Sequence, residues 1–230
     1  MKTIGLIGGM SWESTSEYYR IINEEVRAQK GALNSAKCIL VSVNFAEIEM
    51  CQREGDWNQA AAILIKAAQA LEKGGAEFIL ICANTMHKVA EQIQVAVSIP
   101  IIHIADATAE KIRRFEISTV GLLGTKYTME ENFYISRLEN KGINVIVPNA
   151  IDREVVHHVI FNELCLGQIS SKSKKKYLEI IEELHSKGAE GIILGCTEIS
   201  LLIKDMDINL PIFDTTRIHA TKAVVLSIKS

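Results

Sequence analysis

The chain contains the stretch Gly75-Ala76-Glu77-Phe78-Ile79-Leu80-Ile81-Cys82-Ala83-Asn84-Thr85, and it recurs 113 residues later as Gly188-Ala189-Glu190-Gly191-Ile192-Ile193-Leu194-Gly195-Cys196-Thr197-Glu198. In each copy an apolar run ends in small polar residues, a pattern typical of a buried strand followed by a turn. Two further blocks recur in the same order, since 4–8 resembles 120–124 and 99–102 resembles 210–213. The repeat predicts two pseudo-equivalent halves.

Short apolar runs alternate with longer segments of helical period along the whole chain. The strand candidates are 3–7, 38–43, 77–82, 101–104, 119–123, 144–147, 191–194 and 212–213. The helix candidates are 14–29, 57–73, 86–97, 105–115, 130–141, 153–166, 173–187 and 215–229. Strands that alternate with helices predict parallel sheets joined by right-handed crossovers. The predicted fold class is therefore α/β.

The repeat also predicts how the chain divides. We expect a first α/β lobe over residues 1–115 and a second over 116–214, with the boundary near Phe115–Ser118. The last helix, at 215–230, is expected to pack back on the first lobe.

Composition limits the classes of function. The 230 residues are 48% hydrophobic and 23% charged, as in an ordinary globular protein, and a net charge of −3 gives no sign of a nucleic-acid surface. Apolar runs of about six residues are far too short to span a bilayer. The five cysteines are an odd number without Cys-x-x-Cys spacing, which fits neither a disulfide framework nor a zinc site. We expect a reduced, cytoplasmic protein that binds neither nucleic acid nor membrane.

The strand ends are the expected position of a site, because open parallel sheets bind ligands beyond the carboxyl ends of their strands. If the two lobes face each other, four turns converge on a cleft between them: 8–11, 83–85, 124–126 and 196–198. The turns at Ala83 and Cys196 lead into helices, and backbone N–H groups at a helix start attract a carboxylate or a phosphate.

Cys196 is the candidate for chemistry. A helix N-terminus lowers the pKa of a thiol, and a thiolate formed near neutral pH can act as a general base. A small core cysteine is the alternative interpretation. Cys82 is expected to be a core residue, because the repeat pairs it with Gly195 and pairs Cys196 with Ala83. His87, at a helix start, is expected to be a surface or capping residue with a secondary role at the site.

These motifs resemble the PLP-independent aspartate/glutamate racemase family over essentially the whole chain. The matching segments are Ile4–Met10, Asn84–His87, Gly121–Thr125 and Gly195–Ile199. The resemblance implies two Rossmann-like lobes with the active site between them, a homodimer, a small-molecule substrate, and neither cofactor nor metal. It also implies two cysteines that flank the substrate Cα, one removing the α-proton while the other protonates the opposite face.

The chain departs from that pattern at Ala83, where the family has its first catalytic cysteine. It resembles most a subgroup that keeps only the second thiol and favours L-aspartate and L-glutamate. By this resemblance, Cys196 deprotonates the L-isomer. The residues implied in substrate binding are Met10, Gln52, Arg53, Ala83, Asn84, Thr85, Thr125, Thr197 and Glu198. Among them, Gln52 and Arg53 are expected in a loop after the second strand, where Arg53 would suit a side-chain carboxylate.

Three alternatives stay open beside a slow or one-sided racemase. The first is a decarboxylase of the arylmalonate type, which also keeps a single cysteine in its second lobe. The second is chemistry of the maleate isomerase type, which expects both thiols. The third is a non-catalytic protein that binds amino acids or dicarboxylates, a possibility raised by the methyl group of Ala83.

Overall fold

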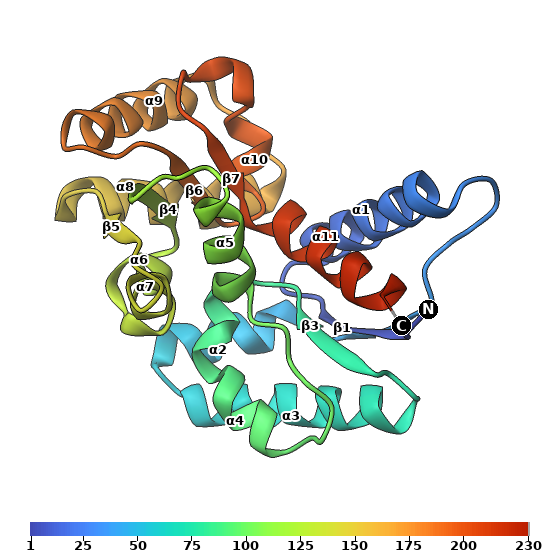
Figure 1. Cartoon of the computed structure of the whole chain (residues 1–230). Coiled ribbons are helices and arrows are strands. Elements are labelled where there is room, and N and C mark those ends of the chain that lie inside the picture. The colour runs from blue at the N-terminus through green and yellow to red at the C-terminus, as the bar shows by residue number, and fades with distance from the viewer. Residues whose placement is uncertain (230) are drawn as a thin grey trace. The chain divides into compact units, whose positions relative to one another are not determined.

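A computed structural model describes residues 1–229 of the chain (Figure 1). Internal contacts divide it into two compact units. Unit 1 comprises residues 1–104 together with the chain from 216 onward, and unit 2 comprises 105–215. Each unit is a short parallel sheet flanked by helices, which confirms the predicted fold class of two α/β lobes.

Unit 1 is built on a three-stranded parallel sheet of order β2-β1-β3. Its elements are β1 (Ile4–Gly8), α1 (Trp12–Lys30), β2 (Cys38–Ser42), α2 (Phe45–Glu54), α3 (Trp57–Lys73), β3 (Phe78–Ile81), the 3-10 helix η1 (Thr85–Val89), α4 (Ala90–Val95) and α11 (Thr215–Ile228). The strands β1 and β3 are Ile- and Leu-rich and buried on both faces, whereas the edge strand β2 is partly exposed.

Unit 2 is built on a four-stranded parallel sheet of order β5-β4-β6-β7. Its elements are α5 (Ile104–Arg113), β4 (Thr119–Gly124), α6 (Lys126–Glu130), α7 (Asn132–Glu139), β5 (Asn144–Ile146), α8 (Ala150–Asn162), η2 (Leu164–Leu166), α9 (Ser171–Ser186), β6 (Ile192–Gly195), α10 (Ile199–Leu202), η3 (Asp205–Asp207) and β7 (Ile212–Asp214).

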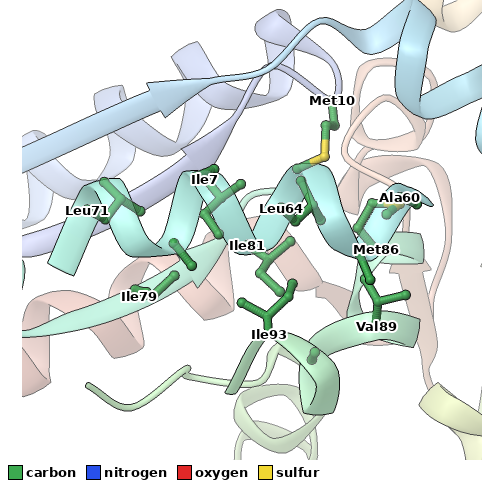
Figure 2. Close-up of a cluster of buried hydrophobic side chains, with 14 of the residues drawn as sticks. Ile7, Met10, Ala60, Leu64, Leu71, Ile79, Ile81, Met86, Val89 and Ile93 are labelled. Atoms are coloured by element: carbon green, nitrogen blue, oxygen red, sulfur yellow. The ribbon is translucent and has the colours of Figure 1, made fainter. Parts of the chain in front are cut away.

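Two hydrophobic clusters cover the two faces of the unit 1 sheet. Successive side chains of a strand point to opposite faces, so Ile79 and Ile81 join one cluster whereas Leu80 joins the other. The first cluster packs α3 and α4 on the sheet, and Figure 2 shows Leu64 of α3 close to Ile81 and Ile7. The second cluster is formed with α1 and α11.

The register of the sheets confirms the internal repeat. Gly5 pairs with Ile79 in unit 1, and Gly121 pairs with Ile192 in unit 2. These are the residues that the sequence alignment of the two halves makes equivalent. Both units therefore contain the same two-strand core, hydrogen-bonded in the same register.

The strand that follows each core pair differs between the units. In unit 2, Ile192 donates its N–H to Pro211 O at 2.9 Å, and β7 continues from there. In unit 1, Ile79 donates to Pro100 O at the same distance, but only a single bridge, to Ile101, follows. The predicted strand 101–104 is thus reduced to this bridge, because α5 already begins at Ile104.

The division between the units differs from the predicted boundary near residue 115. The chain passes from unit 1 to unit 2 at Ile104/Ala105, so nearly all of α5 belongs to unit 2. Side-chain contacts of α5 explain this: the Tyr134 hydroxyl donates to Thr108, and Arg137 pairs with Asp106 at 3.0 Å. Within residues 1–229, no helix has both the length and the hydrophobicity that crossing a bilayer requires.

Candidate functional site

In unit 1 the turns after β1 and β3 begin next to each other. The Cys82 N–H donates to Ile7 O at 2.9 Å, which keeps the two strands paired up to their ends. The Ser14 hydroxyl, on α1, donates to Cys82 O at 3.1 Å. Met10 follows β1 and is buried. The turns at 8–11 and 83–85, which the sequence assigned to the site, are therefore neighbours within this unit.

Gly9 shapes the first of these turns. Its φ of +91° lies in a region that favours glycine. A Cβ at this position would lie 2.1 Å from Val43 O, far inside contact distance. The Gly9 N–H donates to the Thr15 hydroxyl at 2.8 Å, which ties the turn to α1. Glycine is thus required here both by backbone conformation and by the close approach of a second chain segment.

The second turn carries Ala83, Asn84 and Thr85. Ala83 is half-buried, and the other two are buried. His87, in η1, is only 2% exposed, so the expectation of a surface histidine is wrong. Its Nδ1 lies 2.8 Å from Ala83 O and bonds it. The imidazole folds back over the turn because η1 places residue 87 one turn beyond residue 83.

The positions of Cys82 and Ala83 confirm that Cys82 is a core residue. Cys82 is fully buried in the cluster with α1 and α11, whereas Ala83 packs against the cluster on the opposite face. Burial raises the pKa of the Cys82 thiol strongly, so this group stays protonated at neutral pH.

Gln52 and Arg53 lie on α2 rather than in the predicted loop. Two residues set the bounds of this helix: the Asn44 side chain caps its first turn, and Gly55 ends it in the left-handed conformation. Gln52 is buried and donates to Met86 Sδ at 3.1 Å. Arg53 is 64% exposed and pairs with Glu49 one helical turn away. The two side chains thus have different surroundings, although they are adjacent in sequence.

In unit 2 the ends of β4 and β6 are paired through two glycines. Gly124 pairs with Gly195, and a Cβ on Gly195 would lie 2.9 Å from Leu123 O. Thr125 follows β4 and is buried, and its hydroxyl caps α6 by accepting the Thr128 N–H at 3.3 Å. The turns at 124–126 and 196–198 are therefore neighbours in unit 2, as their counterparts are in unit 1.

Cys196 follows Gly195 directly and is half-buried. Its thiol donates to Glu198 Oε2 at 3.0 Å. Burial, and then the Glu198 carboxylate, raise the pKa of the Cys196 thiol well above its usual value. The predicted lowering of this pKa is thus wrong. The next helix, α10, starts only at Ile199 and is four residues long, so its N-terminal potential does not offset the effects of burial and of the adjacent negative charge.

The Cys196–Glu198 contact was not predicted, since the family resemblance implied only substrate binding for Glu198. Their spacing of two in a turn is the signal that could have suggested it. Thr197, between them, is half-buried, and its carbonyl accepts from the Ser200 hydroxyl at 2.7 Å. Among residues 1–229, no group of three or more His, Cys, Asp or Glu side chains is arranged to hold a metal ion.

Comparison with known proteins adds three findings. Residues 7–223 match the family model described as Asp/Glu/Hydantoin racemase. The chain is 25% identical to the Bacillus subtilis (strain 168) protein named broad specificity amino-acid racemase RacX, with 96% of each chain covered. It is also similar to two crystal structures. One, from Yersinia pestis, has 54% identity and a TM-score of 0.93 with both chains fully covered. The other, an aspartate racemase homologue from Pyrococcus horikoshii OT3, has 42% identity and a TM-score of 0.84 with 99% of each chain covered.

Proposed function

The chain belongs to the Asp/Glu/Hydantoin racemase family, and on that premise we propose that it is a cofactor-independent racemase of aspartate or glutamate in which Cys196 acts on the L-isomer. The names of its relatives, an amino-acid racemase and an aspartate racemase homologue, support the substrate class. The observation that carries the proposal is a contrast between the repeats. A half-buried thiol follows β6, while the equivalent position after β3 holds the methyl group of Ala83.

The proposed reaction begins with the Cys196 thiolate. Because the pKa of Cys196 is raised, the resting group at neutral pH is the thiol, bonded to Glu198. An amino-acid substrate brings an ammonium group, and a positive charge nearby favours the thiolate, so the thiol releases its proton to solvent when the substrate binds. The thiolate removes the α-proton of the L-isomer, and the electron pair of the C–H bond stays on the substrate as a carbanion.

The step is completed from solvent. Water protonates the opposite face of the carbanion and becomes hydroxide, which then takes the proton from the Cys196 thiol and restores the thiolate. No net proton is consumed. A positioned acid or base contributes about 10²- to 10⁴-fold to such a step. The absence of a thiol at residue 83 therefore slows interconversion in both directions, whereas α-proton exchange of the L-isomer through Cys196 stays faster.

Substrate binding is proposed for side chains at the strand ends of each unit. Buried polar side chains at strand ends, Asn84 and Thr85 in unit 1 and Thr125 in unit 2, are suited to hold the α-carboxylate together with backbone N–H groups. The half-buried Thr197 and the buried Met10 complete this set. They carry no charge that would compete with the substrate carboxylate.

The side-chain carboxylate of the substrate is assigned to α2. Gln52 is the better candidate, because its amide is buried and directed to Met86, the residue after Thr85. Arg53 is exposed and paired with Glu49, so it must break that ion pair to bind substrate. Replacing each residue by alanine in turn and measuring KM for L-Asp and L-Glu separates the two.

The test is α-proton exchange in D₂O, followed by NMR with the L- and D-isomers of both amino acids. We expect the L-isomers to exchange faster than the D-isomers. The Cys196→Ser variant should lose exchange, and Cys82→Ser serves as the matched control that should keep it. Because the base is a thiol with a raised pKa, kcat/KM should rise about tenfold per pH unit between pH 7 and 8.5.

Two results would refute the proposal. Exchange that persists in Cys196→Ser would remove the thiol from the mechanism. Absence of exchange with any of the four isomers, combined with a rise in melting temperature on adding one of them, would identify a binding protein without activity.

A second candidate function is favoured by the protonation state of Cys196. A resting thiol is ready to donate a proton, as a single-cysteine decarboxylase of the arylmalonate type requires after CO₂ leaves its substrate. Incubation with phenylmalonate tests this directly. Release of CO₂ that depends on Cys196, with no exchange of amino acids, would favour the decarboxylase.

A further inference from the structure

Three histidines of unit 1 form a buried cluster that the proposed reaction does not use. His87, His103 and His219 are 2%, 7% and 0% exposed. The ring centroid of His87 lies 4.5 Å from that of His103 and 5.7 Å from that of His219. They come from η1, from the segment before α5, and from α11. Histidine is not needed to fill a core, so the specific hydrogen bonds of these rings are informative.

His87 connects two segments of backbone. Its Nε2 accepts the Ile104 N–H at 3.2 Å, so the ring proton must be on Nδ1. Nδ1 therefore donates to Ala83 O, at 2.8 Å. The imidazole is neutral and has one tautomer, which is fixed by a backbone donor on one side and a backbone acceptor on the other.

His219 makes a second connection of the same kind. Its Nε2 lies 2.7 Å from Ile102 O, and because a carbonyl only accepts, Nε2 carries the proton. Its Nδ1 accepts from the Tyr18 hydroxyl at 2.8 Å. Both ring nitrogens are thus engaged by the neutral form.

The backbone held by these rings leads directly into unit 2. The chain leaves unit 1 after Ile104 and returns at Thr216. His87 bonds the last residue before the first crossing, and His219 bonds Ile102, two residues earlier. His219 itself lies within one helical turn of the second crossing.

The other end of the His87 connection lies at the proposed substrate turn. Ala83 O and the N–H of Asn84 belong to one planar trans peptide and point in opposite directions. A hydrogen bond that fixes the Ala83 carbonyl therefore also fixes the direction of the Asn84 N–H. We assign this N–H to the backbone groups proposed above to hold the substrate carboxylate.

We propose that His87 and His219 are positioning residues, which orient the peptide between Ala83 and Asn84 for substrate and couple it to the backbone of the first crossing. The part concerning substrate rests on the proposed racemase function. The coupling itself rests only on the hydrogen bonds within unit 1. A conformational change at Ile104 would be transmitted to the substrate turn through one imidazole ring.

Two variants of His87 each keep a different one of its two hydrogen bonds. His87→Asn places an amide N–H near the position of Nδ1 and can keep the bond to Ala83 O. His87→Gln places its amide near the position of Nε2 and can keep only the bond to Ile104. The matched control is His185→Gln, because Nδ1 of His185 bonds Ala189 O at 3.0 Å in unit 2, remote in sequence from both crossings.

The first measurement is the rate of α-proton exchange of L-Asp and L-Glu. We expect kcat/KM to fall about tenfold in His87→Gln, the effect of losing one hydrogen bond, and less than about threefold in His87→Asn. His185→Gln should match the wild type. A reversed order of the two His87 variants, or equal losses in both, would overturn the positioning role, since a loss of stability alone would not distinguish them.

The second measurement does not need activity. Amide hydrogen exchange, read by mass spectrometry, is followed in peptides that cover 83–88 and 101–106. In His219→Phe, which removes the bond to Ile102, we expect exchange in both peptides to rise about tenfold or more, although residue 219 bonds only the second. Unchanged protection of 83–88 would refute the coupling. A wild-type protein without α-proton exchange would refute the proposed function and leave this test intact.

Discussion

Acid should destabilise unit 1 through His219. Burial, and then the neighbouring His87, lower the pKa of His219 to about 3, whereas an unfolded histidine has a pKa of about 6.5. As the pH falls below 6.5, His219 binds a proton in the unfolded chain but stays neutral in the folded chain. The stability that comes from a neutral His219 is therefore present above pH 6.5 and is lost as the pH falls toward 3.

The size of the effect follows from these two values. Between pH 6.5 and 5.0 the imidazole of the unfolded chain goes from half protonated to almost fully protonated, while the folded one stays neutral. Integrating the difference in bound protons gives a loss of about 1.6 kcal/mol in the free energy of unfolding. In His219→Gln the same fall in pH removes no free energy of unfolding through residue 219, because glutamine does not titrate. Its amide can still donate to Ile102 O, so the variant is expected to fold.

Urea unfolding at the two pH values measures the loss. Both tryptophans of the chain, Trp12 and Trp57, lie in unit 1, so their fluorescence reports the unfolding of that unit. The wild type should lose about 1.6 kcal/mol more than His219→Gln between pH 6.5 and 5.0. His158→Gln removes an exposed histidine of unit 2 and serves as the control. An equal loss in wild type and His219→Gln would refute the reasoning, because it would mean that the buried ring takes up its proton while folded.

Three further predictions concern the turns. Glu198→Gln removes the negative charge beside Cys196, so the pKa of that thiol should fall and its alkylation by iodoacetamide at pH 8 should accelerate about threefold or more; an unchanged rate, read by peptide mass spectrometry, would contradict this. Gly9→Ala should lower the free energy of unfolding of unit 1 by about 3 kcal/mol or more, because its Cβ would lie 2.1 Å from a carbonyl oxygen. Gly55→Ala, at a left-handed position in open space, should cost only about 1 kcal/mol by urea unfolding. Ala83→Cys should increase D-to-L conversion, measured by chiral chromatography, and a rate equal to that of the wild type would argue against residue 83 facing the substrate.

The fold was predictable because the hydrophobic residues are periodic along the sequence and the two halves repeat the same strand motifs. The equivalence of Gly5 and Gly121 in the sequence anticipated the matched strand register, and alternation along β3 assigned Cys82 to the core. The helix α2 was missed because its polar sequence gives a weak apolar stripe. Its ends are instead defined by the cap of Asn44 and the left-handed Gly55.

The candidate site was only partly predictable, because its electrostatics depend on side-chain geometry. The helix rule predicted an acidic thiol at Cys196. Burial of the thiol instead raises its pKa, and the Glu198 carboxylate, 3.0 Å away, raises it further. The buried state of His87 likewise depends on Ile104, which is 17 residues away and contacts it only in the folded chain. A local sequence pattern does not indicate a partner that is distant along the chain.

The discontinuous composition of unit 1 has a consequence for biosynthesis. Its second hydrophobic cluster contains Ala220, Ala223 and Val224 from α11, packed on Ile4 and Leu6 of β1. Unit 2, by contrast, is one uninterrupted segment. A ribosome therefore finishes unit 2 before it has made α11, one of the two helices that cover this face of the first sheet. During translation that face therefore stays only partly covered, by α1, while more than a hundred further residues are made.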